Sequence, residues 1–219
     1  MKLGLFLATS CLVIGVSSAP SQTVYSVPAN SRGNQLMLTI ANESRYISAE
    51  DVEVRTVKHS AAVTFKPESQ FLKVVPAQKE SDVVFVFDVG RGARVNSLDT
   101  LEFVVKDKVS MMWKKLVIVT YTAPKVFALE QNFPNPFNPT TTIYYQLPTD
   151  SRVSIVVYDL LGREVKRLLG ETKEAGYHQE RFDASGIASG VYFYRMTAEA
   201  LDGQGKNNYV STKKFVVLK

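Results

Sequence analysis

One proline-rich segment, residues 129–140, restricts the possible folds of this chain more than any other. It contains three prolines and two phenylalanines: Pro134, Pro136, Pro139, Phe133 and Phe137. Each proline fixes its own φ and removes a backbone donor, and it drives the preceding residue toward extended geometry. Neither a helix nor a central sheet strand can run through such a segment. A flexible linker would instead be rich in Gly and Ser. We therefore expect a rigid arm that both phenylalanines hold against the edge of a folded domain.

The rest of the chain predicts β-structure. Short segments rich in Val, Ile, Phe, Tyr and Thr alternate with Gly, Pro, Asn and Asp, and no helical period is sustained. In the first half we expect strands at Gln35–Ala41, Glu50–Lys58, Phe71–Val75, Asp82–Val89, Thr100–Lys106 and Lys115–Tyr121. In the second half we expect strands at Thr141–Leu147, Arg152–Tyr158, Glu164–Leu168, Gly176–Phe182, Gly190–Ala198 and Thr212–Leu218. Apolar residues lie on both faces of Asp82–Val89, which predicts a central strand covered on both sides.

These strands predict an all-β protein with two immunoglobulin-like β-sandwich domains in tandem after an N-terminal signal peptide. The expected parts are a signal peptide at 1–21, a sandwich at 22–123, the arm at 124–139 and a second sandwich at 140–219. The antibody pattern of two cysteines around a tryptophan is absent from the sequence, so the expected likeness is architectural.

The first residues are typical of an export signal. Lys2 provides the positive start, an apolar run covers residues 3–16, and small residues follow. Cleavage after Ser18, Ala19 or Ser21 stays open, and Cys11 leaves a lipoprotein as an alternative. If the signal is removed, the remaining chain has no cysteine, which excludes disulfides and thiolate metal sites. The formal net charge of +5, without a Lys/Arg run longer than two, does not indicate nucleic-acid binding.

No catalytic constellation is evident, and we expect neither an enzyme nor a cofactor. His59 beside Ser60 lacks a recognisable third triad member, and His178 has the pattern of a structural side chain bonded to a turn. Three aspartates, Asp150, Asp159 and Asp183, offer a calcium site at one end of the second sandwich, although turn aspartates are the commoner explanation.

The segment 106–115 is the best candidate contact surface of the first half. It contains two methionines, the single tryptophan and four lysines, and its candidate contact residues are Met111, Met112, Trp113 and Lys114. Tryptophan stacks on flat apolar surfaces while lysines meet anions. The alternative is a β-hairpin whose tryptophan folds back on the core.

Ordered motifs in the second half resemble those of the C-terminal sorting domain of type IX secretion cargo. The resemblance runs from about Phe127 to Lys219 and rests on the arm followed by Ile143–Pro148, then on Val156–Val165, Ala175–His178, Ser189–Met196 and Lys213–Lys219. It assigns these sorting-motif residues: Gln131, Asn132, Pro134, Asn135, Pro136, Phe137, Asn138, Pro139, Tyr158, Asp159, Gly162, Gly176, His178, Gly190, Tyr192, Lys213 and Lys214.

The resemblance implies a Gram-negative bacterium of the Bacteroidetes, Chlorobi or Ignavibacteria kind. It implies passage through the periplasm and recognition by the outer-membrane type IX translocon, giving a secreted or cell-surface protein without a transmembrane segment. In that family the tail can be cut off and the passenger attached to surface lipopolysaccharide or released. For the first domain we expect a non-catalytic binding or adhesion module with a glycan or protein partner. The alternative is a structural spacer or subunit of a surface assembly.

Overall fold

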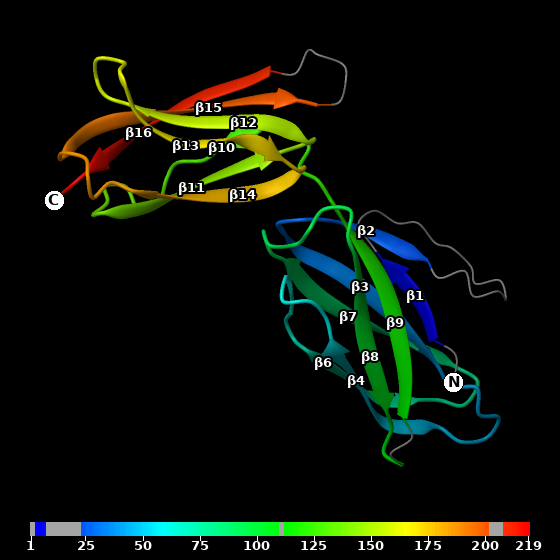
Figure 1. Cartoon of the computed structure of the whole chain (residues 1–219). Coiled ribbons are helices and arrows are strands. Elements are labelled where there is room, and N and C mark those ends of the chain that lie inside the picture. Colours follow the sequence, from blue (N-terminus) through cyan, green and yellow to red (C-terminus); the bar gives the residue numbers. More distant parts are fainter. Residues whose placement is uncertain (1–2, 8–22, 110–111, 202–207) are drawn as a thin grey trace. The chain divides into compact units, whose positions relative to one another are not determined.

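The computed structural model describes residues 3–7, 23–109, 112–201 and 208–219, and these residues form strands and loops without a helix (Figure 1). The chain divides into two compact units, Met1–Thr122 and Ala123–Lys219. Within the described ranges, no helix has the length and apolar character needed to cross a membrane.

The first unit contains two sheets. One has the order β2-β9-β8-β4-β6 and the other the order β1-β3-β7-β5. The strands of the first sheet are β2 (Val24–Pro28), β4 (Ala49–Lys58), β6 (Ser69–Val75), β8 (Leu98–Lys106) and β9 (Met112–Thr122). Those of the second are β1 (Leu3–Leu7), β3 (Ser31–Ala41), β5 (Val63–Phe65) and β7 (Glu80–Val89). All neighbours are antiparallel except β2 and β9, which run parallel.

Aromatic rings from both sheets meet in the core of the first unit. Phe85 of β7 lies 5.1 Å from Phe103 of β8 between ring centroids, and Phe65 of β5 lies 5.6 Å from Phe103. All three are buried because alternate residues of each strand point to the same face.

The prediction that Asp82–Val89 is covered on both sides is wrong. Phe85 and Phe87 face the core, but Val84 on the other face is 41% exposed. β7 is central in its sheet only in the sense that it has a hydrogen-bonded strand on each side. A strand with apolar residues on both faces can therefore still have one face exposed to solvent.

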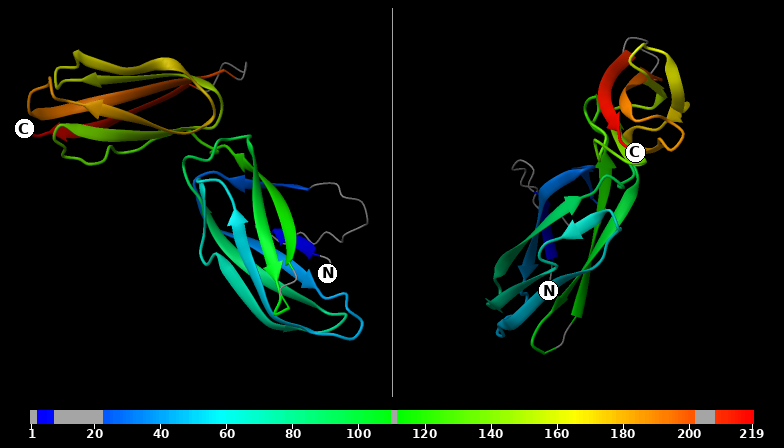
Figure 2. Two further views of the ribbon diagram at one scale, coloured as in Figure 1. Left: turned by 60° about the horizontal axis from the view of Figure 1, so that its bottom comes forward. Right: turned by 90° about the vertical axis from the view of Figure 1, so that its left-hand side faces the viewer.

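The second unit also has two sheets, with orders β10-β11-β14 and β13-β12-β15-β16, both antiparallel (Figure 2). Their strands are β10 (Ala128–Leu129), β11 (Thr140–Leu147), β12 (Ser151–Tyr158), β13 (Glu164–Lys173), β14 (Gly176–Asp183), β15 (Gly190–Ala200) and β16 (Asn208–Val217). Phe182 of β14 and Phe215 of β16 lie 5.5 Å apart between ring centroids, so the two sheets share one core.

The sequence predicted the longer strands of both units and missed the short ones. β2, β5 and β10 were not predicted, because segments of two to five residues show too few alternations to be recognised. β13 continues to Lys173, past the predicted end at Leu168, since an exposed and charged edge strand lacks the apolar alternation that marks a strand.

Residues 3–7, inside the predicted signal peptide, form β1 and pair with Leu36–Ile40 of β3. The expected cleavage positions and Cys11 lie outside the described residues. Signal-peptide removal and the immunoglobulin-like classification of the two units stay predictions.

Phe215 is the residue on which the core of the second unit depends most. Its ring lies within 6 Å of four others, those of Phe137, Phe182, Tyr192 and Tyr194. We expect Phe215→Ala to lower the free energy of unfolding of the second unit by about 3–5 kcal/mol. Urea titration followed by far-UV circular dichroism measures this loss.

Trp113, the single tryptophan, belongs to the first unit, so its fluorescence transition serves as an internal control. That transition should stay unchanged in Phe215→Ala. Leu161→Ala, at a side chain that is 78% exposed, should change neither transition. An unchanged circular dichroism transition in Phe215→Ala would contradict the proposed core.

Candidate functional site

The arm is bonded along the outer edge of β16. The N–H of Phe137 donates to the carbonyl of Val216 at 3.1 Å, and the N–H of Leu218 donates to the carbonyl of Phe137 at 2.9 Å. The side chain of Asn135 accepts from the N–H of Val216 at 3.0 Å. The amide of Gln131 donates to the carbonyl of Lys214 at 2.8 Å. The edge of the last strand is thereby closed by residues that precede it by about eighty positions.

Asn132 fixes the turn of the arm from inside. Its side chain is 2% exposed, and its amide donates to the carbonyl of Pro134 and to the hydroxyl of Thr141, both at 3.0 Å. The hydroxyl of Thr141 donates to the same carbonyl at 2.8 Å. The peptide bonds before Pro134, Pro136 and Pro139 are all cis. The buried amide of Asn132 thus gives the carbonyl of Pro134 a hydrogen-bond donor, which the prolines of the arm cannot supply because they have no N–H group.

Tyr194 of β15 holds the entry to the arm. Its hydroxyl donates to the carbonyl of Glu130 at 2.7 Å and accepts from the N–H of Asn132 at 2.9 Å. The side chain is fully buried. The arm is therefore joined to β15 as well as to β16.

Only one of the two phenylalanines of the arm reaches the core. Phe137 is 3% exposed and contacts the rings of Phe182 and Phe215. Phe133 is 76% exposed, so the expectation that both phenylalanines hold the arm is wrong for it. The backbone of Phe133 instead bonds that of Thr142 at 3.0 Å in both directions, which leaves its side chain pointing outward.

A tight turn follows β12. The carboxylate of Asp159 accepts from the N–H groups of Leu161 and Arg163, both at 2.9 Å, and from the guanidinium of Arg163 at 2.7 Å. These hydrogen bonds lower the pKa of Asp159, and the one from the N–H of Arg163 contributes most. Gly162 has a φ of 77°, a conformation that glycine adopts without strain.

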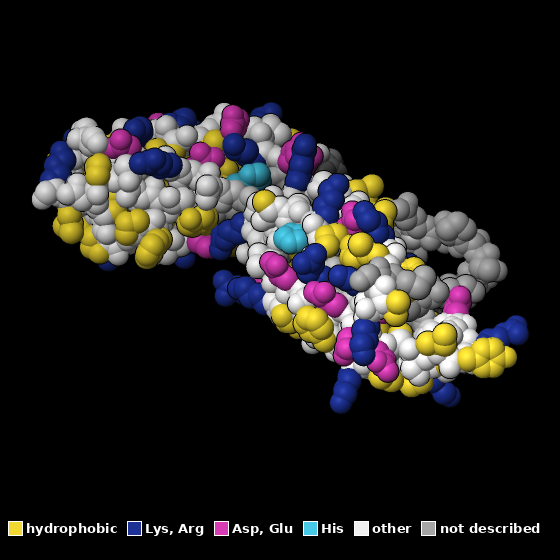
Figure 3. Space-filling view, turned by 90° about the horizontal axis from the view of Figure 1, so that it is seen from below, with side chains coloured by type: hydrophobic (Ala, Val, Ile, Leu, Met, Phe, Trp, Pro, Cys, Tyr) yellow, Lys and Arg dark blue, Asp and Glu magenta, His cyan; other side chains and the backbone are white. Residues whose placement is uncertain are grey.

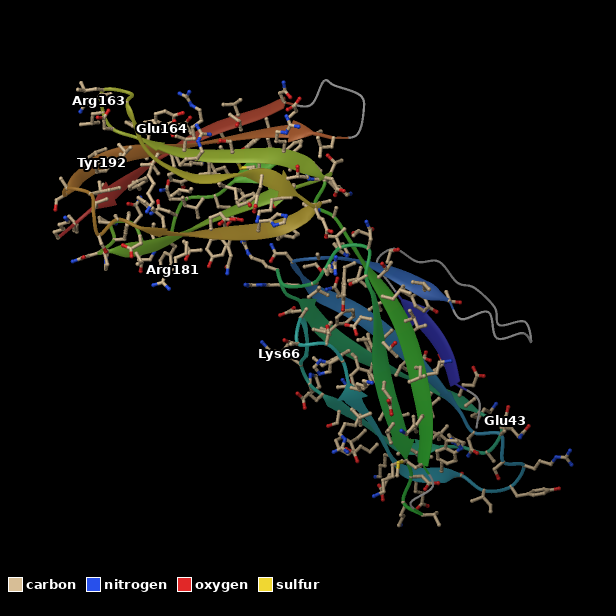
Figure 4. All side chains as sticks on the ribbon, viewed as in Figure 1. Glu43, Lys66, Arg163, Glu164, Arg181 and Tyr192 are labelled. Carbon is tan, nitrogen blue, oxygen red and sulfur yellow. The ribbon has the colours of Figure 1, made fainter. Side chains whose placement is uncertain are left out.

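Most of the sequence-predicted sorting residues lie at one end of the second unit. In the register of the strands, Thr140 pairs with Asp183 and Tyr158 with Phe193 at this end, which also carries the arm and the C-terminus. The predicted residues here are Gln131, Asn132, Pro134, Asn135, Pro136, Phe137, Asn138, Pro139, Tyr158, Asp159, Gly162, Gly190, Tyr192, Lys213 and Lys214. We call this end the arm end. Figure 4 shows Arg163, Glu164 and Tyr192 at it.

Gly176 and His178 lie at the opposite end, where Leu147 pairs with Gly176. A ring nitrogen of His178 is 2.8 Å from the carbonyl of Glu174 in the β13–β14 turn, and its ring stacks on Tyr145. The structure therefore separates these two residues from the other predicted sorting residues.

Three exposed leucines at the arm end were not predicted. Leu160 and Leu161 in the turn after β12 are 69% and 78% exposed, and Leu218 is 50% exposed. Together with Phe133 they give this end an apolar character beside the exposed Lys214. The sequence signal that could have found them is the pair Leu160-Leu161 directly before Gly162, because apolar residues in a turn remain exposed.

The three candidate calcium ligands do not meet. Asp150 precedes β12 and Asp159 follows it, so they lie at opposite ends of an extended strand. Each carboxylate serves a separate turn: Asp150 accepts from Ala175, and Asp183 accepts from Ser185. The expectation that the three border one site at one end of the unit is wrong, since the strand between them sets them apart.

The structure places Trp113 half-buried on the inner face of β9, opposite the buried Val105. The neighbouring Met112 and Lys114 point outward, and Lys114 pairs with Glu102 at 2.8 Å. Met111 lies outside the described residues. On the face of the first unit that Figure 3 shows, hydrophobic side chains are interspersed with charged ones. The predicted contact residues therefore do not all share one face.

The His59 ring contacts a backbone carbonyl and an aromatic side chain. A ring nitrogen of His59 lies 3.0 Å from the carbonyl oxygen of Ser60, and its ring contacts Phe65. The carboxylate of Asp99 accepts from the hydroxyl of Tyr121.

Comparison with known families decides what the second unit is. Residues 131–217 match the family described as "Secretion system C-terminal sorting domain". The second unit is a sorting domain of this family. The match confirms the resemblance seen in the sequence, and it includes β11–β16 together with most of the arm. A type IX sorting domain implies export by that secretion system, to the outside of the cell or its surface.

No curated protein matches the chain. Among solved structures, dimeric latent PorU from Porphyromonas gingivalis is 15% identical with a TM-score of 0.34, and the match covers 99% of this chain and 20% of PorU. The periplasmic chaperone SfaE is 9% identical, with a TM-score of 0.36 and 99% of each chain covered. The Escherichia coli chaperone DraB is 13% identical, with a TM-score of 0.34, covering 98% of this chain and 95% of DraB. These TM-scores are too low to support an argument, and this chain spans about a fifth of PorU.

The hydroxyl of Tyr194 provides a direct test of the arm's attachment. We expect Tyr194→Phe to lower the free energy of unfolding of the second unit by about 1–3 kcal/mol, because two buried backbone groups lose their partner. Tyr192→Phe is the matched control, since the Tyr192 hydroxyl is exposed and donates only to the carbonyl of Ala188. Equal effects of the two substitutions in urea titrations would contradict the role given to Tyr194.

The same residue predicts a pH dependence. Burial raises the pKa of Tyr194 to about 12, although the N–H of Asn132 acts in the opposite direction. In the unfolded chain the pKa of tyrosine is about 10, so above that pH unfolding releases a proton and the free energy of unfolding falls. The stability that Tyr194 adds over Tyr194→Phe should therefore shrink between about pH 10 and 12. A constant difference from about pH 8 to 12 in urea titrations would contradict it.

Proposed function

We propose that this chain is a non-catalytic protein which the type IX translocon exports by binding the arm end of its sorting domain. The family match at residues 131–217 is the observation that supports export most strongly. The arm end supports the choice of surface, since motif residues far apart in the sequence come together there beside exposed leucines. Delivery through the periplasm to the cell surface, where lipopolysaccharide attachment or release follows, belongs to the proposal.

The first unit acts by contact with another macromolecule rather than by chemistry. Its histidine is held against a backbone carbonyl and a phenylalanine ring. Within the described ranges, no group of three His, Cys, Asp or Glu side chains could hold a metal ion. These observations support a binding or structural role for the passenger.

Between those two roles, the edge of β3 supports an assembly subunit rather than an adhesion module. An adhesion site would be favoured by exposed aromatics around one loop end. Trp113 is half-buried on the inner face of its strand, while Tyr46 in the loop between β3 and β4 is 88% exposed. An assembly subunit would be favoured by a long, unprotected sheet edge. β3 has such an edge, which is paired here only with the strand from the predicted signal peptide.

Substitution of the arm-end leucines tests the surface used for export. We expect Leu160→Ser combined with Leu161→Ser to reduce the surface-delivered fraction about tenfold, because burying one leucine is worth about 1.5–3 kcal/mol. Leu201→Ser is the matched control, since Leu201 is also exposed but lies at the opposite end, where its N–H bonds the carbonyl of Asp150. Fractionation of cells with and without the translocon measures delivery.

Equal delivery of the double variant and of the Leu201→Ser control would contradict the proposed surface. Removal of Thr212–Lys219 gives a second test, since it takes away Phe215 and the strand edge that the arm bonds. That truncated chain should stay in the periplasm or be degraded. Its normal delivery to the surface would contradict export through the sorting domain.

A further inference from the structure

We propose that the outer edge of β3 is a self-association site, at which the processed chain pairs β3 antiparallel with β3 of a second copy. This inference rests on the proposed export, because export removes the predicted signal peptide and with it β1. In the described structure β3 pairs with β7 on one side and with Leu3–Leu7 on the other. Loss of residues 1–21 leaves that second side open.

Among the sheet edges of the described structure, β3 has the longest stretch without a charge or a proline. Arg32 and the register shift between Ser31 and Asn34 lie at its start. Residues 33–42 contain no charge and no proline. β6 carries Lys73, β2 ends at Pro28 after five residues, and β5 and β10 have only three and two residues. β13 and β14 carry several charged residues each, and the end of β16 is bonded by the arm. Edges are normally protected by such features because open ones pair with other chains.

The hydrogen bonds of Asn42, the residue after β3, show which backbone N–H and C=O groups of β3 point to the open edge. The N–H of Asn42 donates to the carbonyl of Lys79, next to β7, at 2.9 Å, and the carbonyl of Asn42 accepts from Gln78 at 2.9 Å. In an antiparallel sheet the direction of these groups alternates from residue to residue. The groups of Leu36, Leu38 and Ile40 therefore point to β7, and those that point to the open edge belong to Gln35, Met37, Thr39 and Ala41.

The pairing of β1 shows what this edge accepts. An antiparallel, uncharged strand lies along it, with Phe6 opposite Met37 and Gly4 opposite Thr39. β3 itself has the same chemistry, since Leu36, Leu38 and Ile40 alternate with Met37 and Thr39. A second copy therefore offers the kind of strand that the edge already binds.

Antiparallel self-pairing also satisfies the outward backbone groups of this edge. A two-fold axis at Leu38 sets Met37 opposite Thr39 of the other copy and Gln35 opposite Ala41, so every outward group is paired. The nearest charged residues on the two sides of the uncharged stretch are Arg32 and Glu43. The same axis sets both residues outside the paired stretch, with Arg32 opposite Ser44 and Glu43 opposite Gly33 of the other copy. Such two-fold contacts are the commonest form of self-association.

The test compares residues 22–219 with the full chain by sedimentation equilibrium. We expect the shorter chain to have twice the monomer mass, and the full chain to be a monomer because its own β1 occupies the edge. Met37→Pro in the shorter chain removes an outward N–H and should restore the monomer, whereas Met37→Val keeps that N–H and should leave the dimer intact. Circular dichroism and Trp113 fluorescence check that each variant folds.

Hydrogen exchange tests the same site without substitution. The amides of Met37 and Thr39 should be protected in the shorter chain in a concentration-dependent manner, and amides of β16 should not change with concentration. A peptide of residues 2–8 should dissociate the dimer, while the same peptide with methylated nitrogens at Gly4 and Phe6, the positions opposite Thr39 and Met37, should not.

Three results would overturn the proposal: a shorter chain that stays monomeric, a dimer that survives Met37→Pro, or a dimer without concentration-dependent protection of Met37 and Thr39. A monomer that binds the peptide would mean that the edge receives a strand from a different protein. Failure here leaves the export experiments unaffected, because those measure delivery by the sorting domain and not the mass of the processed chain.

Discussion

The contact between the arm and the last strand is the interaction on which the second unit depends. A strand at the edge of a sheet, as β16 is, would normally leave its outward N–H and C=O groups to water or to another chain. Here the backbone of Phe137 bonds Val216 and Leu218, and the side chain of Asn135 bonds Val216 as well. The ring of Phe137 enters the core beside Phe215. Backbone and side chain of one residue thus tie the start of the sorting domain to its end.

This closure explains how motifs separated in sequence become one surface. The proline-rich arm, the turn held by Asp159 and the start of β15 are far apart along the chain, but strand register places them all at the arm end. Prolines suit the arm because they cannot extend a sheet, so the arm bonds β16 at a few positions without adding a further edge. Recognition of the arm end, as proposed above, would require the whole unit to be folded. A chain whose last strand is not yet paired would present neither the arm nor the exposed leucines in this arrangement.

Much of the fold could be predicted from the sequence, because alternation over seven or more residues indicates a strand whichever partner it pairs with. The proline arm and the sorting family were likewise recognisable, since both rest on local or ordered motifs. The pairing of residues that lie far apart in the sequence could not be predicted. Sequence could not show that Phe133 points outward while Phe137 is buried, because that choice depends on a backbone bridge to Thr142. It could not show that Asp150 and Asp159 lie at opposite ends of β12, nor that Trp113 takes the inner face of β9. Val84 was misjudged for the same reason, since an apolar residue on a sheet face is compatible with exposure.

The two units differ in how a sheet edge is protected. The arm closes the edge of β16, whereas residues 33–41 of β3 contain neither a charge nor a proline. The central claim is that the arm closes the last strand, and the amide hydrogens of Val216 and Leu218 report on it most directly. Measured by hydrogen exchange and nuclear magnetic resonance in the intact chain, both should be protected to an extent similar to the amides of β15. Exchange of these two amides at the rate of an unpaired chain end, with β15 protected, would contradict the account.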